Sequence, residues 1–149
     1  LIHGDGNPQT REARVVALEK MTGKTIWETG RPSSARSENE HSYASPTIYR
    51  DTERAFLLTH GADYIVAHDL KDGHEIWRCG GLHPPAGYDP TLRFVSSPLA
   101  IKGLIVVPSA KAGITLALKP TGQGDITGKQ EFVKQIKALL IGFSAGGLI

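Results

Sequence analysis

Hydrophobic residues in this chain fall into short runs separated by polar turn clusters, rather than into long periodic stripes. The runs Ala13–Leu18, Tyr64–Ala67 and Gly113–Leu118 are rich in β-branched residues, and a turn cluster and a further short segment follow each of them. Runs of this kind, bounded by glycine and polar residues, are typical of β-strands. Residues 1–132 show no amphipathic helical period. The pattern therefore predicts an all-β fold.

Two more pairs of short apolar segments precede the second and third of these runs. Pro46–Arg50 with Ala55–Thr59, and Pro98–Ile101 with Leu104–Val107, are expected to be strand pairs, and Lys102-Gly103 is expected to form the tight turn within the latter. Each unit of the chain would then hold about four strands.

The chain contains an internal repeat. Residues 15–30, VVALEKMTGKTIWETG, align without a gap with residues 65–80, IVAHDLKDGHEIWRCG, at an offset of 50. Two Ser-Pro pairs that precede strands recur 52 residues apart. A third unit, residues 114–126, aligns Ala117 with Ala67, places Gly122 at the turn glycine and lacks the tryptophan. The repeated positions are Ala17, Glu19, Gly23, Trp27, Ser45 and Pro46 in one copy, and Ala67, Asp69, Gly73, Trp77, Ser97 and Pro98 in the next.

The repeated residues predict a hairpin with a defined turn. Gly23 and Gly73 suit a position with positive φ, and the acids Glu19 and Asp69 can accept hydrogen bonds from backbone N–H groups of the turn. We expect the recurring tryptophans to pack between neighbouring repeats, because a ligand-stacking residue would be needed at one position and not in every unit. The alternative is that one of the two tryptophans stacks on a bound cofactor.

Four antiparallel strands in a repeat of roughly 40–50 residues are typical of a β-propeller blade. The order alanine, acid, glycine, tryptophan and Ser-Pro resembles the repeat of pyrroloquinoline-quinone-type (PQQ-like) β-propellers over about residues 12–126. The resemblance implies an incomplete propeller over residues 1–128, with blade units around 1–30, 43–80 and 95–128. Residues 129–149 lack the tryptophan strand and the next Ser-Pro pair, and are interpreted as an atypical, truncated or non-native tail.

The resemblance implies less about function. Some members of the family are quinoprotein alcohol or sugar dehydrogenases that hold PQQ with calcium, often above a vicinal disulfide, and others are non-catalytic scaffold lipoproteins of outer-membrane assembly. Cys79 is the one cysteine here, so that disulfide cannot form within the chain. No cluster of acids and amides suggests a calcium site. No cofactor is evident, and PQQ with calcium enters through the resemblance alone.

Candidate binding residues lie in two long connections, Thr29–Ala44 and Cys79–Arg93. Both follow a tryptophan strand and precede a Ser-Pro strand, so both are expected on the same face of a propeller. Functional residues concentrate in such loops, although ordinary polar connectors would look similar. The histidines show no metal-ligand spacing, and no metal site is predicted. The candidate residues are Arg31, His41 and Tyr43 in the first connection, and His83, Tyr88 and Arg93 in the second.

Composition narrows the classes of partner. A net charge of +2 without a basic stripe gives no electrostatic basis for nucleic-acid binding. The longest apolar stretch, Ala138–Ile149, is far shorter than the ~20 residues of a membrane-spanning helix. The segment shows no signal peptide, and an extracytoplasmic, periplasmic-type location is expected from the resemblance only.

The end of the chain carries a G-x-S-x-G pattern around Ser144, which is the pattern of a hydrolase nucleophile elbow. In α/β-hydrolases the acid and the histidine follow the nucleophile, and Ala145–Ile149 contain neither. A triad within this chain is therefore not expected, and no catalytic residue is assigned.

The sequence favours a PQQ-like β-propeller module that binds or scaffolds outside the cytoplasm, without catalysis in this segment. Its expected partners are further blades of a longer chain and a protein or small-molecule ligand on the loop face. The alternatives are part of a PQQ-dependent dehydrogenase and, least favoured, a serine hydrolase using Ser144.

Overall fold

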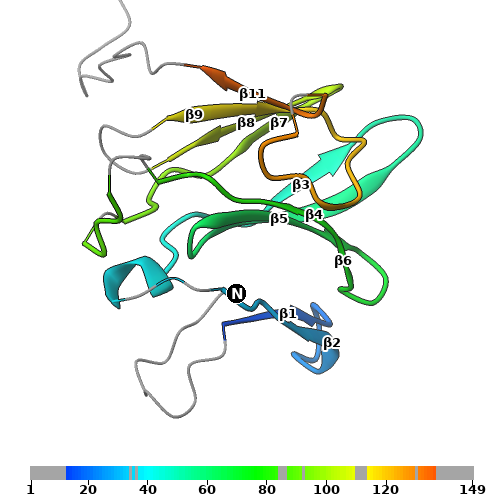
Figure 1. Cartoon of the computed structure of the whole chain (residues 1–149). Helices are drawn as coiled ribbons and strands as arrows, with labels where there is room; N and C mark the ends of the chain where they lie inside the picture. Colours follow the sequence, from blue (N-terminus) through cyan, green and yellow to red (C-terminus); the bar gives the residue numbers. More distant parts are fainter. Residues whose placement is uncertain are drawn as a thin grey trace, which may run out of the picture.

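The computed structural model describes residues 13–33, 35, 37–83, 87–91, 93–109, 114–129 and 131–136. These residues form an all-β structure without an α-helix, as the sequence predicts (Figure 1). No helix among them is long and apolar enough to cross a membrane. The elements are β1 (Arg14–Leu18), β2 (Thr25–Gly30), the 3-10 helix η1 (Ser37–Glu40), β3 (Thr47–Arg50), β4 (Ala55–Gly61), β5 (Tyr64–Asp69), β6 (Glu75–Cys79), β7 (Leu99–Ile101), β8 (Leu104–Pro108), β9 (Thr115–Leu118), β10 (Gly124–Asp125) and β11 (Val133–Ile136).

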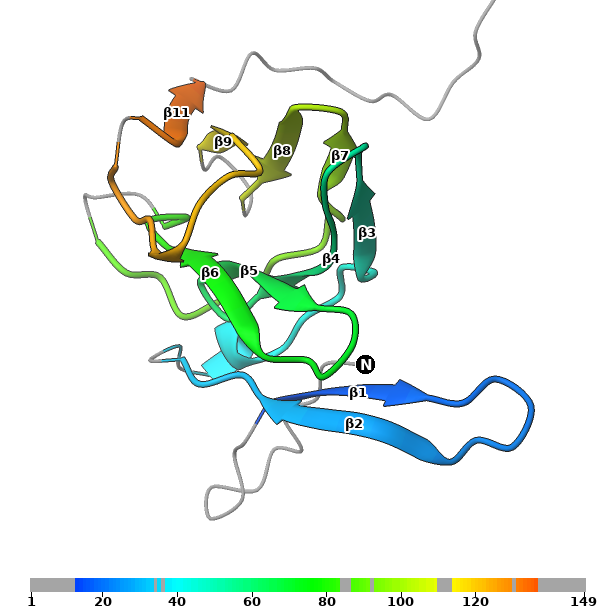
Figure 2. The ribbon, with the colours of Figure 1, turned by 90° about the vertical axis from the view of Figure 1, so that its right-hand side faces the viewer.

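The strands form three sheets in three layers. The first is the hairpin β1–β2, the middle sheet has the order β10-β6-β5-β4-β3, and the last has the order β11-β9-β8-β7. All pairs are antiparallel except β10 with β6. The middle sheet lies between the hairpin and the last sheet in both views (Figures 1 and 2).

The two repeated hairpins have the same register. Ala17 lies opposite Trp27 and Ala67 lies opposite Trp77, and each pairing shifts directly after the alanine. Gly23 and Gly73 have φ of +71° and +78°, which confirms the left-handed turn position expected for glycine. The acids hold the turns as predicted, since Glu19 accepts from the N–H groups of Met21 and Thr22, and Asp69 from that of Lys71.

The third unit departs from the sequence prediction. Gly122 is not the left-handed glycine of a short hairpin, because φ is not positive there and the chain does not return directly to β9. It runs instead along the middle sheet as β10, pairs with β6 and buries Ile126 completely. Strand β9 pairs with β8 on one side and with β11 on the other, and β11 lies in the segment assigned to the tail and places Lys134 opposite Ala117. The insertion covers the outer edge of β6, which would otherwise present unpaired backbone groups.

The main core lies between the middle and last sheets. Trp77 is fully buried there, its ring packs edge-on against Phe56 at 5.9 Å, and Phe56 stacks on Tyr49 at 4.8 Å. A Cβ atom on Gly122 would lie 3.5 Å from Trp77 Cγ, so this glycine lies against the indole. The other core side chains are Leu58, Ile65, Ala67, Cys79, Leu82, Phe94, Ile105, Val107, Leu116, Leu118 and Ile126.

The first hairpin packs on the opposite face of the middle sheet through the other repeated tryptophan. The Trp27 ring lies over the turn at Gly73, where a Cβ atom would overlap it, and Trp27 Nε1 donates to the Leu70 carbonyl at 3.0 Å. Each tryptophan thus packs on a glycine of the following unit, at Gly73 and at Gly122. The tryptophans pack between repeats, as the sequence predicts.

The two Ser-Pro segments lie side by side. The Ser45 N–H donates to Ser97 Oγ at 2.8 Å, and the Thr47 hydroxyl donates to the Pro98 carbonyl at 3.3 Å. As a result β3 and β7, the strands at one edge of their sheets, are neighbours (Figure 2).

Candidate functional site

The connections between β2 and β3 (31–46, the first loop) and between β6 and β7 (80–98, the second loop) meet at one end of the sheets. Ser42 forms a parallel bridge with Phe94, and the Tyr43 N–H donates to the Phe94 carbonyl at 3.2 Å. The Ala62–Asp63 turn between β4 and β5 joins them, because the Ser33 hydroxyl donates to the Ala62 carbonyl at 2.8 Å. We call this surface, formed by the two loops and the turn, the loop face.

An exposed cluster on the loop face links both loops by charge. Arg93 of the second loop forms an ion pair with Glu38 of η1, and its guanidinium lies 5.8 Å from the ring centre of Tyr43. The hydrogen bond from Arg93 lowers the pKa of Glu38, and Glu38 raises the pKa of Arg93. Tyr43 is 55% exposed. The cluster presents an ion-paired guanidinium beside an exposed aromatic ring.

A second cluster, largely buried, is centred on His83. His83 Nδ1 lies 2.5 Å from Asp63 Oδ1, and the imidazole packs against the rings of Tyr88 at 4.6 Å and Phe94 at 5.4 Å. Asn39 of η1, which is fully buried, places Nδ2 2.9 Å from His83 Nε2 and donates to the Asp89 carbonyl at 3.0 Å. His83 therefore connects the turn, η1 and the second loop.

The contacts of His83 define what its ring can do. Because the Asn39 amide nitrogen is a donor, Nε2 accepts, and Nδ1 carries the proton that faces Asp63. Burial raises the pKa of the Asp63 carboxyl, while His83 and Tyr88 act against that rise. With both ring nitrogens engaged, the geometry favours a positioning role for His83 over that of a general base.

The turn that presents Asp63 is conformationally unusual. Ala62 and Asp63 have φ of +48° and +67°, and both lie in a two-residue connection between antiparallel strands. Two positive φ values are the conformation of a type I′ hairpin turn, which commonly uses Asn-Gly. Side chains at such positions carry local strain, and here the strain accompanies the contact of Asp63 with His83.

The structure groups the six predicted loop residues differently from the sequence. Tyr43 and Arg93 share the exposed cluster, His83 and Tyr88 share the buried one, and the partly buried His41 follows η1 next to Glu38. Arg31 belongs to neither cluster, because it is 2% exposed and lies between the first hairpin and the middle sheet, where it donates to Thr59 and Tyr64.

The sequence analysis missed Asn39 and Asp63 of the loop face, and the candidate residues chosen from the first loop did not include Glu38. The usable signal was the Gly-Ala-Asp sequence between two strands, which indicates a tight turn with an acid at its exit. The partners of that acid are remote in sequence.

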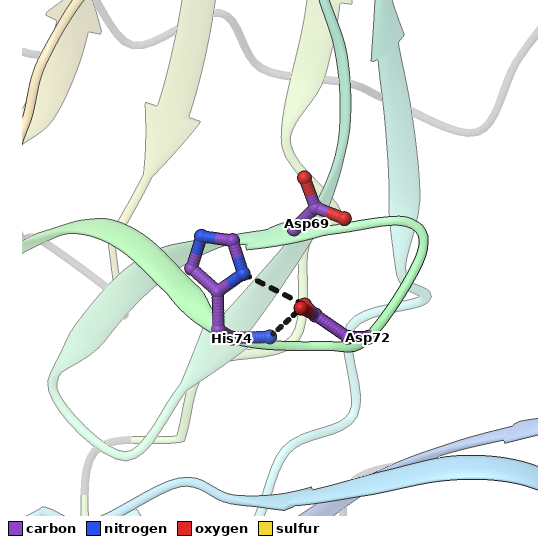
Figure 3. Close-up of side chains that lie close together, drawn as sticks. All are labelled: Asp69, Asp72 and His74. Carbon is purple, nitrogen blue, oxygen red and sulfur yellow. Dashed lines mark hydrogen bonds and ion pairs between the residues drawn. The ribbon is translucent and has the colours of Figure 1, made fainter.

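The turn at the other end of β5 gathers potential metal ligands that the sequence analysis left scattered. Asp69, Asp72 and His74 have ligand atoms within 4.8 Å of one another, and His74 Nδ1 lies 2.7 Å from Asp72 Oδ1 (Figure 3). The carboxylates also accept the backbone N–H groups of Lys71 and His74. These turn hydrogen bonds account for the arrangement, and we assign no ion to it.

The residues of this chain do not fit a PQQ site as far as the structure describes them. Trp27 and Trp77, the candidate platforms, are both engaged between sheets. Cys79 is completely buried at the end of β6, and burial raises the pKa of its thiol to about 12. We therefore derive no chemical step through that cofactor.

Ser144 and its G-x-S-x-G pattern lie outside the described residues. Comparison of the chain with protein-family models, curated proteins and solved structures finds no match in any of the three. The function of the chain is therefore inferred from the geometry of the sheets and of the loop face.

Stability is expected to fall as the pH is lowered from neutral to about 4, because two buried histidines resist protonation. Burial lowers the pKa of His60 and of His68 from the ordinary value to about 4. Between the unfolded pKa near 6.5 and the folded value, the unfolded chain binds protons that the folded chain does not, so each histidine contributes a loss of roughly 3 kcal/mol at the acid limit. Urea unfolding at several pH values measures the slope.

Asp63 also contributes to the pH dependence of stability, because its raised pKa gives the folded chain stability that is lost as the pH rises. A histidine variant separates the contribution of the histidines from that of Asp63. His68→Leu introduces the residue found at the equivalent position 18 and should flatten the slope, whatever its absolute stability. A slope as steep in this variant as in the wild type would contradict the assignment.

Proposed function

We propose that the chain is a segment of a β-propeller of PQQ-like repeats that acts as an extracytoplasmic binding or scaffold module through its loop face. The observation that carries the proposal is the repeated packing of one unit on the next. Hairpins of identical register recur, and the tryptophan of each packs on a glycine of the following unit. Strands β3 and β7 are neighbours, which supports the proposal because they would be the inner strands of adjacent blades in a propeller. The extracytoplasmic location follows from the resemblance to the family.

The loop face is suited to binding because the buried cluster around His83 supports the exposed cluster of Tyr43 and Arg93. His83 holds the turn, η1 and the second loop together, and Tyr43 and Arg93 lie on the solvent side of the buried cluster. A cation beside an exposed aromatic ring complements an acidic or aromatic group of a protein or small-molecule partner.

Site-specific crosslinking tests the binding face directly. A photo-crosslinking amino acid in place of Tyr43 should give a discrete adduct in a cell-envelope extract, and Arg93→Glu should abolish it. The matched control carries the crosslinker in place of Lys71, an exposed residue of the β5–β6 turn at the opposite end, and should give no such adduct. The proposal would be contradicted by equal crosslinking from positions 43 and 71, or by an adduct that still forms in the Arg93→Glu variant.

His83→Ala is expected to release the two loops from each other and to cost about 2 kcal/mol, since it removes a buried hydrogen-bonded group. Amide hydrogen exchange in η1 and in residues 87–91 should accelerate, while exchange in β4 and β5 should change less. His74→Ala, at an exposed turn, is the control and should change stability by less than about 0.5 kcal/mol. Unchanged exchange in the loops would show that His83 does not position them.

A further inference from the structure

The buried cluster of the loop face contains an amide whose orientation is fixed. Asn39 is fully buried, and its Nδ2 donates to the Asp89 carbonyl at 3.0 Å while lying 2.9 Å from His83 Nε2. Exchanging the oxygen and the nitrogen of this amide would place Oδ1 against the Asp89 carbonyl oxygen, and two acceptors cannot form a hydrogen bond. The nitrogen therefore faces His83, and only an unprotonated Nε2 can accept from it.

A proton on His83 Nε2 is incompatible with this arrangement. Both ring nitrogens of an imidazolium are donors. The new N–H would face the Asn39 amide nitrogen, which is also a donor, at 2.9 Å. Asn39 Oδ1 is the atom that could accept this proton, and it has no hydrogen-bond partner among the described residues. Turning Oδ1 toward His83 would, however, break the hydrogen bond from Asn39 to Asp89. Protonation of His83 therefore deprives Asn39 of one of its two partners.

The charged groups around the ring decide which element moves. Asp63 faces Nδ1 from the β4–β5 turn and accepts its proton in either charge state of the ring. Tyr88 packs on the ring from the second loop, and the Asp89 carboxylate of that loop interacts electrostatically with His83. Arg31 acts on Asp63 from the side of the first hairpin. Because both carboxylates attract an imidazolium, the ring stays with the turn and the second loop, and η1 is the element that is released.

A second contact between η1 and the second loop is exposed. Glu38 of η1 pairs with Arg93, and the hydrogen bond from Arg93 lowers the pKa of Glu38, so the pair stays charged at mildly acid pH. Ion pairs in such exposed settings contribute little to stability. This pair therefore does not hold η1 in place once the contact with His83 is lost.

We propose that proton uptake by His83 releases η1 from the second loop, so that mildly acid pH opens the loop face. The proposal rests on the proposed function, because it concerns the regulation of the same surface. On release, Tyr43, which follows η1 in the first loop, separates from Arg93 in the second loop, and the exposed cluster is lost. Since the closed arrangement accepts only the neutral ring, the ratio of open to closed chains rises by up to about tenfold for each pH unit below about 6.5, the ordinary pKa of an imidazole.

Native-state amide hydrogen exchange of the chain without a partner measures this release. Protection in η1, corrected for the intrinsic exchange rates, should fall by about tenfold between about pH 7.5 and about pH 5.5. His83→Gln keeps an acceptor for Asn39 and leaves the buried His60 and His68 in place, but it removes the proton. This variant should lose the tenfold change.

Two control variants show whether His83 is the group that titrates. His74→Gln removes an exposed histidine of the β5–β6 turn and should keep the tenfold change of the wild type. Asp63→Asn removes the neighbouring carboxylate but keeps an acceptor for His83 Nδ1, and asparagine is tolerated at the positive φ of this position. It should also keep the change.

The proposal would be overturned by η1 protection that is the same at both pH values in the wild type, that falls equally in His83→Gln, or that stops falling in Asp63→Asn. Nitrogen NMR of the wild-type ring is a test that needs no variant, since His83 should carry its proton on Nδ1 at neutral pH. A proton on Nε2 there would also overturn the proposal. Crosslinking from position 43 is done at neutral pH, so the proposed function and its regulation fail independently.

Discussion

Trp77→Ala is expected to lower the free energy of unfolding by about 3–5 kcal/mol, which is the range for deleting a large aromatic side chain from a core. Trp77 is completely buried and connects the middle sheet to the last one. Its ring contacts Phe56, and its Cγ lies against Gly122. The deletion would leave a cavity between two sheets that share one core, so neither sheet can close it alone.

Equilibrium unfolding in urea measures this loss, and Trp27→Ala is the matched comparison. Trp27 occupies the same repeat position but is only partly buried. Its replacement should therefore cost less than that of Trp77, although it also removes the hydrogen bond to Leu70. Equal losses in the two variants would contradict the ranking of the two contacts.

Arg31→Ala is expected to destabilise the chain by an amount on the order of 3 kcal/mol, because hydrogen bonds of charged groups contribute roughly 1.5–3 kcal/mol each. Arg31 Nε donates to Thr59 Oγ1 at 3.0 Å, and the guanidinium donates to the Tyr64 carbonyl at 2.6 Å. The Thr59 hydroxyl lies 3.0 Å from His68 Nε2, and His68 Nδ1 lies 3.2 Å from the Gly73 carbonyl. One side chain thus anchors a polar network that runs to the repeat turn.

Burial, followed by the nearby Arg78 charge, lowers the pKa of Arg31 to about 10, so the group stays charged at neutral pH. Arg31→Met keeps most of the volume but none of the donors, and should recover part of the loss. Arg14→Ala is the surface control: Arg14 pairs with Glu28 in an exposed setting, where such pairs contribute little. An Arg31→Ala variant as stable as Arg14→Ala would show that the network is not stabilising.

The sequence predicted the strands well because the signals that define them are local. The alternation around Ala67 and Trp77, the left-handed glycines and the acids that hold the turns all act within about ten residues. Their recurrence at an offset of 50 then fixes which strands are equivalent.

The loop face and the third unit were less predictable because remote contacts determine them. Asp63 and His83 are 20 residues apart, and Asn39 and His83 are 44 apart, in segments without periodicity. Arg31 looked like a loop residue, and only the packing of the first hairpin on the middle sheet buries it. At Gly122 the local turn signal was outweighed by the pairing of β10 with β6.

The central claim, that each tryptophan packs on a glycine of the next unit, is tested most directly by comparing Gly73→Ala with Gly23→Ala in dilute protein. Both glycines have left-handed φ at equivalent turn positions, so each substitution carries a backbone penalty of roughly 1–2 kcal/mol. At Gly73 the new Cβ also meets the Trp27 ring, whereas at Gly23 it meets nothing within 4 Å. Gly73→Ala should therefore lose more unfolding free energy, by about 1–3 kcal/mol for the overpacked contact, and should shift the tryptophan fluorescence toward that of an exposed ring. Equal losses with unchanged fluorescence would contradict the claim.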